Sequence, residues 1–223
     1  MQLNERTISR APEAILATNK VIRNTYSLLS MTLLFSALTA GLSVVANVSS
    51  GVSLISFIVA IGLVWFVLPR TANSSAGIFV VFAFTGLLGF ALGPMLNQYL
   101  ALENGPRLIG MALGGTGVIF LGLSGYALTT RQNFSFLGGF LFIGFFVVLG
   151  AIVLSLFFNI PGLQLAISAA IILIMSGFIL YDTSNIIHGG ETNYLHATVS
   201  LYMSIFNIFV HLLSLLGALG GDD

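Results

Sequence analysis

Seven long apolar stretches occupy most of this chain between residues 26 and 216. About 20 apolar residues in a helix cross a hydrocarbon layer of about 30 Å. With 6% charged residues, the chain has too few polar side chains to cover these stretches in water. Because they are apolar on all sides, and do not alternate as barrel strands do, we expect an all-α, polytopic membrane protein, a seven-transmembrane-helix bundle. The stretches are Tyr26–Ala46, Val52–Leu68, Ala76–Leu96, Leu108–Leu128, Phe136–Phe158, Leu163–Ile187 and Leu195–Leu216.

The chain divides into three parts on this basis. Residues 1–24 carry six charged side chains and form a polar N-terminal tail, residues 25–219 the membrane domain, and residues 220–223 a short C-terminus. The tail has too few apolar residues to fold alone, although a weak helix is expected to begin at Pro12, a residue suited to a first helical turn. We predict that the tail is flexible.

The distribution of lysine and arginine predicts the orientation. With the N-terminus in the cytosol, six of the seven cationic residues fall on the cytosolic side, where they are enriched in membrane proteins. Seven spans then place the C-terminus outside. The six are Arg6, Arg10, Lys20, Arg23, Arg70 and Arg131, and Arg107 is the exception.

Several classes of function are disfavoured by the composition. The formal net charge is zero, so nucleic acid is not an expected partner, and no cysteine is present to form a disulfide, a thiolate nucleophile or a metal ligand. The histidines at 188, 196 and 211 match no metal-binding spacing. We therefore predict no metal, no cofactor and no enzymatic activity, since paired catalytic carboxylates and a His-Glu-x-x-His motif are also missing from the sequence.

Small residues recur within the spans. The stretch 114–122 is rich in glycine but lacks the Lys-Ser/Thr ending of a phosphate-binding loop. Pairs four residues apart, Gly89 with Gly93 and Gly110 with Gly114, are instead typical of membrane helices that approach one another closely.

The last span carries a polar stripe. Its members recur at intervals of four, three, four and three residues, which places them on one helical face. Lipid penalises such a face, so it must contact protein or water. Hydrogen bonding between helices and the wall of a polar path are both open interpretations. The members are Ser200, Ser204, Asn207, His211 and Ser214.

Asp182 lies near the end of the sixth span, inside an apolar run. An ionised carboxylate within a bilayer costs about 2.5–3.5 kcal/mol, so Asp182 must find a partner or be protonated. Asp182 and Ser204 are each eleven residues from Asn193, so an antiparallel pair of helices places them at similar depth. We predict that Asp182 meets the polar stripe or Arg70, and that it forms a proton or ion switch with Ser204, Asn207 and His211. A carboxylate that only caps the interface is the alternative.

Segments spread over the whole membrane domain resemble the Bax-inhibitor (transmembrane Bax-inhibitor-motif) family. Its Gly-Pro-x-Leu element matches Gly93, Pro94 and Leu96, and its following Ala, Thr and Phe positions match Ala112, Thr116 and Phe120. The stretches "GFILYDTSNIIHGGETNY" and "SLYMSIFNIFVHLL" are similar to its last two spans. The resemblance is strongest to the bacterial YccA-like branch, and it implies a seven-helix fold in the bacterial inner membrane.

The resemblance implies two functions. In the YccA-like branch it implies binding to the membrane-anchored AAA protease FtsH and modulation of its action in membrane-protein quality control. In the wider family it implies a pH-sensitive calcium or proton leak gated by two aspartates, of which the first corresponds to Asp182. This chain has Ser204 at the second position, which puts the two-aspartate gate in doubt. We expect a regulator of FtsH, with the leak as the alternative.

Overall fold

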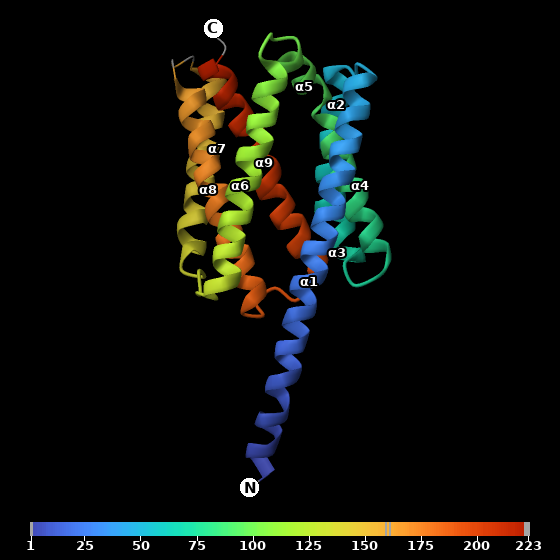
Figure 1. Ribbon diagram of the computed structural model, residues 1–223, viewed down its shortest axis with the longest axis vertical. Coiled ribbons are helices and arrows are strands. Elements are labelled where there is room, and N and C mark those ends of the chain that lie inside the picture. The colour runs from blue at the N-terminus through green and yellow to red at the C-terminus, as the bar shows by residue number, and fades with distance from the viewer. Residues whose placement is uncertain (1, 159, 161, 221–223) are drawn as a thin grey trace.

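The structure is a computed structural model that describes the backbone of residues 2–158, 160 and 162–220, and side chains from Leu16 onward within these ranges. Every regular element in the described residues is a helix, and the long helices stand side by side in one bundle (Figure 1). The elements are α1 (Gln2–Val45), α2 (Ser50–Gly62), the π-helix η1 (Leu63–Val67), α3 (Leu68–Thr71), α4 (Ala76–Ala91), α5 (Gly93–Leu100), α6 (Gly105–Thr130), α7 (Leu137–Phe157), α8 (Leu163–Ile187) and α9 (Tyr194–Gly220).

Seven helical stretches in the described residues are long and apolar enough to cross a membrane, which confirms the predicted fold class. The second consists of α2, η1 and α3, and the third of α4 and α5. The seven stretches are Leu16–Val45, Ser50–Thr71, Ala76–Leu100, Gly105–Thr130, Leu137–Phe157, Leu163–Ile187 and Tyr194–Gly220.

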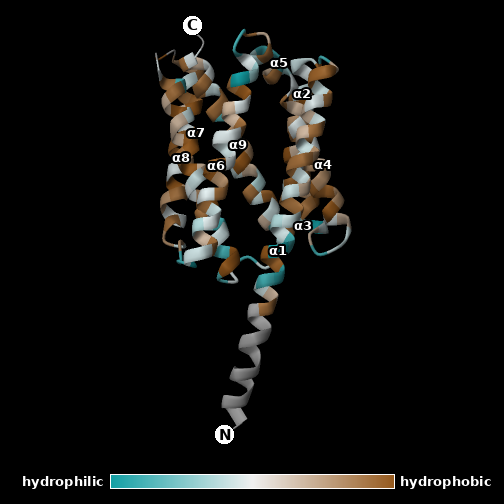
Figure 2. Ribbon diagram, in the orientation of Figure 1, coloured by the Kyte–Doolittle hydropathy of each residue, from teal (hydrophilic) through white to brown (hydrophobic). Residues whose placement is uncertain are grey.

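The outer surface of the bundle is apolar. Figure 2 shows hydrophobic residues along the outer helices, where a water-soluble protein carries charge. On α7, for example, Leu156 and Phe157 are 76% and 77% exposed, whereas small polar side chains such as Thr85 and Thr183 are fully buried. This surface fits a lipid environment, in which hydroxyl groups lie inside and large apolar side chains face outward.

Helix α9 runs through the centre of the bundle and packs against α8, α6, α1 and α4. Its side chains Leu201, Tyr202 and Leu213 are among the most completely buried in the protein. The last predicted span is therefore the central helix of the bundle, with α1, α4, α6 and α8 packed around it.

Glycines allow α1 and α4 to lie close together, as the first small-residue pair predicts. A Cβ atom at Gly89 would collide with the backbone carbonyl of Ser36, and one at Gly93 with the side chain of Ser43. The second pair, Gly110 and Gly114, was wrongly expected to pack in the same way. A Cβ atom at either position meets no described atom within 4 Å, because this face of α6 points out of the bundle.

The N-terminal tail differs from the prediction. It does not begin a weak helix at Pro12. Instead α1 is helical from Gln2 and continues without a break into the first span, so that its first turns project beyond the bundle (Figure 1). The tail sequence lacks an apolar stripe, so its residue pattern did not predict a helix. The tail is helical because it continues the helix of a well-packed transmembrane segment.

The two ends of the described chain lie at opposite ends of the bundle (Figure 1), as an odd number of spans requires. The α3–α4, α6–α7 and α8–α9 connections lie at the end from which α1 projects, here called the tail end. The predicted C-terminal segment is described only at Gly220, and residues 221–223 lie outside the described residues.

Candidate functional site

Asp182 lies on α8, half-buried, one turn and a half before this helix ends at the tail end. The Ser200 hydroxyl on α9 donates a hydrogen bond to Asp182 Oδ2 over 2.5 Å. This bond joins two neighbouring helices through a charge-bearing group, and such bonds are stronger than those between neutral partners. Asp182 thus meets the polar stripe of the last span at Ser200. The proton or ion switch with Ser204, Asn207 and His211 stays a prediction.

The predicted depth of Asp182 was wrong by one helical turn. The turn between α8 and α9 is centred near Gly190 and Glu191, since α8 ends at Ile187 and α9 begins at Tyr194. Asp182 is therefore level with Ser200, and Ser204 lies one turn deeper, where it is 3% exposed. Hydropathy alone does not locate the centre of a polar turn.

The structure does not bring Arg70 to Asp182. Arg70 is exposed on α3, and its guanidinium donates a hydrogen bond to the Phe66 carbonyl in the preceding turn of its own span. Helix α3 packs against η1 and α4, whereas α8 packs against α9, α7, α6 and α1, so the two residues belong to different parts of the bundle. A long cationic side chain at the end of a span turns toward water and toward nearby carbonyls.

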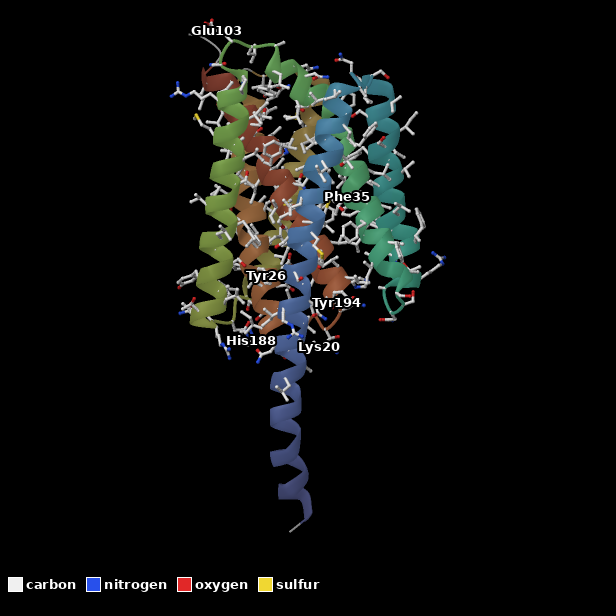
Figure 3. All side chains as sticks on the ribbon, turned by 45° about the vertical axis from the view of Figure 1, so that its right-hand side comes forward. Lys20, Tyr26, Phe35, Glu103, His188 and Tyr194 are labelled. Atoms are coloured by element: carbon white, nitrogen blue, oxygen red, sulfur yellow. The ribbon has the colours of Figure 1, made fainter. Side chains whose placement is uncertain are left out.

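Beside Asp182, a second polar cluster joins three helices. The Tyr26 hydroxyl on α1 hydrogen-bonds Ser124 on α6, and it lies 3.2 Å from Thr183 Oγ1 on α8. Figure 3 shows Tyr26 in the half of the bundle nearest the tail, on the same side as His188. Below it, Thr198 on α9 donates to the Thr25 carbonyl. Sequence analysis missed this cluster, because its members are separated by about 60 to 160 residues and none is charged.

Two further members of the polar stripe, His211 and Asn207, are hydrogen-bonded within the protein. The His211 Nδ1 atom lies 3.2 Å from Ser168 Oγ on α8. Asn207 donates to the Met203 carbonyl of its own helix. The bonds of Ser200 and His211 to α8 favour the first of the two interpretations of the stripe, hydrogen bonding between helices.

Asn207 and His211 also line a cavity of about 130 Å³ between α7, α8 and α9. A water molecule takes up about 30 Å³ in the liquid, so this space could accept a few waters next to two polar side chains. Among the described side chains, no three His, Cys, Asp or Glu residues gather as a metal site would require.

The family-motif residues shape the bundle at the end opposite the tail. Gly93 packs against Ser43 where α4 gives way to α5, and Pro94 lies in the first turn of α5, where a missing N–H is tolerated. Leu96 and Thr116 line a groove between α1, α5, α6 and α9. These residues are spatially separate from Asp182, which lies near the tail end on α8.

Comparison with known proteins agrees with this architecture. A model of the family described as "Inhibitor of apoptosis-promoting Bax1" matches residues 18–221. The chain is 54% identical over 209 residues to the Modulator of FtsH protease YccA of Escherichia coli K12, covering 94% of each chain. It has the same identity and coverage with the protein named Inner membrane protein YccA in E. coli O6:H1. It is 49% identical over 211 residues to a membrane protein of Vibrio cholerae, covering 95% of each. A family match over most of the chain, seven membrane-spanning helices and the Gly-Pro element show that this protein belongs to the Bax inhibitor family.

Proposed function

We propose that this protein is an inner-membrane regulator that binds an FtsH-type AAA protease and modulates its action on other membrane proteins. The observation that carries the proposal is 54% identity, over 94% of both chains, to a protein named as a modulator of FtsH protease. The N-terminus lies in the cytosol, as the lysine and arginine distribution predicts. The protein acts as a binding partner and not as an enzyme.

The shape of the molecule supports a role at the membrane surface. All connections between described helices are short, whereas α1 extends about 20 Å from Leu16 to Gln2 at 1.5 Å per residue. This projection is the largest feature outside the bundle (Figure 1), and a soluble protease domain can reach it beside the membrane. The transmembrane bundle supplies a second contact surface, toward the membrane anchor of the protease.

Reconstitution tests the proposal. The purified protein and an FtsH-type protease are placed in the same vesicles with a second membrane substrate, and turnover of that substrate is followed over time. We expect the protein to copurify with the protease and to change the turnover rate, whereas an unrelated seven-span protein does neither. Unchanged turnover together with failure to copurify would contradict the proposal.

The leak of calcium or protons remains the alternative, because Asp182 is a half-buried carboxylate in a membrane span. Ser204→Asp introduces a second carboxylate on α9, one turn deeper than Ser200. Two acidic groups that interact can share a proton. If the scaffold is competent, vesicles containing this variant show pH-dependent calcium flux with an internal dye, and vesicles with Ser204→Asn do not. Strong flux through the unchanged protein would place the leak ahead of protease regulation.

A further inference from the structure

A deep groove lies on the bundle between α1 and α6. Its walls come from these two helices and its floor is α9. Toward the end opposite the tail it is lined by Leu96 on α5 and by Leu92, between α4 and α5. In Figure 1, α9 is visible between α6 and α1, which both pack against it. The groove has a volume of about 470 Å³, within the range of about 300–1,000 Å³ that is usual for ligand sites.

The two walls meet at the tail end and part above it. Tyr26 on α1 contacts α6 both through its hydrogen bond to Ser124 and through its ring, whose centroid lies 6.2 Å from that of Phe120. Farther along, the walls carry small residues, among them Gly41 on α1 and Gly117 on α6. A Cβ atom at either glycine meets no described atom within 4 Å, so the space between the walls is open.

The chemistry of the lining does not suit a polar ligand. Its hydroxyl groups are already paired within the protein. Ser36 Oγ lies 2.6 Å from Tyr202 Oη, which lies 3.2 Å from the Thr85 carbonyl, and Thr116 donates to the Ala112 carbonyl over 2.7 Å. The remaining lining residues are apolar and none is charged, which matches an uncharged hydrocarbon chain.

The size and position of the groove also limit what can occupy it. Two turns of a helix about 10–12 Å wide fill roughly 850–1,200 Å³, so a helix would seat only part of its width in a groove of about 470 Å³, whereas a single hydrocarbon chain is narrow enough to enter it. At about 30 Å³ for each water-sized group, it holds about 15 groups the size of a methylene. The groove is continuous with the lipid-facing surface, since Leu113 on its α6 wall is 58% exposed.

We propose that this groove binds one acyl chain of a membrane phospholipid, which enters sideways from the bilayer between α1 and α6 and rests on α9. The chain contacts Ile205 and Phe209, which are each 8% exposed and lie behind the outer helices. An ordinary lipid of the surrounding layer touches the outward faces of the bundle but does not reach these two side chains.

Photolabelling tests the proposal in vesicles made with a phospholipid that carries a diazirine in one acyl chain. After illumination, labelled peptides of the full-length protein are identified by mass spectrometry. We expect label on α9 at residues 205–209, in addition to label on the outer faces. Gly117→Leu fills the groove from α6 and should abolish the label on α9 while the outer label remains. Gly41→Leu fills the groove from α1 and should have the same effect.

The matched control is Gly122→Leu. Gly122 is also on α6 and also has open space around a built Cβ atom, but it does not line the groove. The control variant therefore has the same change in helix propensity and should keep the α9 label. Absence of label on α9 in the unchanged protein, or label that survives both groove-filling variants, would overturn the proposal.

Discussion

At the scale of single residues, the bond between Asp182 and Ser200 is the contact that most clearly combines charge, partial burial and a link between helices. Hydrogen bonds to charged groups contribute about 1.5–3 kcal/mol. We expect Ser200→Ala to lower the free energy of unfolding by about that amount when Asp182 is present. In an Asp182→Asn background, which keeps the shape but removes the charge, the loss should be smaller.

A double-mutant cycle measures this coupling, with unfolding followed in mixed detergent micelles. Ser204→Ala serves as the control, because Ser204 lies one turn deeper on α9 than Ser200. Equal losses for Ser200→Ala in both backgrounds would show that the two side chains do not interact.

A second prediction at this scale concerns two glycines of the spans. Gly93→Ala should destabilise the bundle by about 1–3 kcal/mol, because its methyl group would collide with Ser43 and overpack the contact with α1. Gly114→Ala has open space and should be neutral or stabilise α6 by up to about 1 kcal/mol through helix propensity. Thermal denaturation in detergent compares the two variants, and equal effects would contradict the packing difference.

At the scale of elements, α1 combines the tail and the first span in one helix. Among the described side chains of α1, which begin at Leu16, the first that pack on the core are Val21 and Ile22. Deletion of residues 2–12 should therefore leave the bundle folded while removing the projecting turns that a cytosolic protease would engage. We expect the shortened protein to have a longer half-life in cells with FtsH and to inhibit turnover of another membrane substrate more strongly.

A chase of protein half-life, with and without the protease, measures this effect. A full-length variant with residues 2–12 in scrambled order is the control, and it separates the length of the tail from its sequence. A half-life that responds neither to the deletion nor to loss of the protease would show that the tail is not a degradation handle.

The helices were largely predictable from the sequence, and their contacts were not. Hydropathy predicts each span from its run of about 20 apolar residues. For Leu163–Ile187 the predicted and observed bounds coincide. Predicting the partner of Asp182 required the position of the centre of the α8–α9 turn. The polar residues of that loop do not indicate where its centre lies. The contact of Tyr26 with Ser124 and Thr183 depends on how α1, α6 and α8 pack. Hydropathy does not predict which helices are neighbours.

At the scale of the whole molecule, the chain contains no cysteine, so single introduced cysteines report topology without background. Glu103 lies between α5 and α6 at the end opposite the tail (Figure 3), and Ser75 lies between α3 and α4 at the tail end. Both are exposed. We expect a membrane-impermeant thiol reagent to label Glu103→Cys in intact spheroplasts, and Ser75→Cys only after lysis. The reverse pattern would contradict the orientation inferred from Lys and Arg.

The unbroken course of α1 from Gln2 to Val45 has a mechanical consequence. A motor that pulls on the N-terminus applies its force along the axis of the helix. Because α1 contains no loop that could extend first, the force reaches the contacts of the first span directly. The load falls in shear on contacts distributed along α1, from Tyr26 through Ser36 to the close approach at Ser43. Contacts loaded together in this way resist far more force than contacts peeled apart one at a time. The geometry thus predicts that extraction from the N-terminus meets its greatest resistance at the start, before α1 has separated from the bundle.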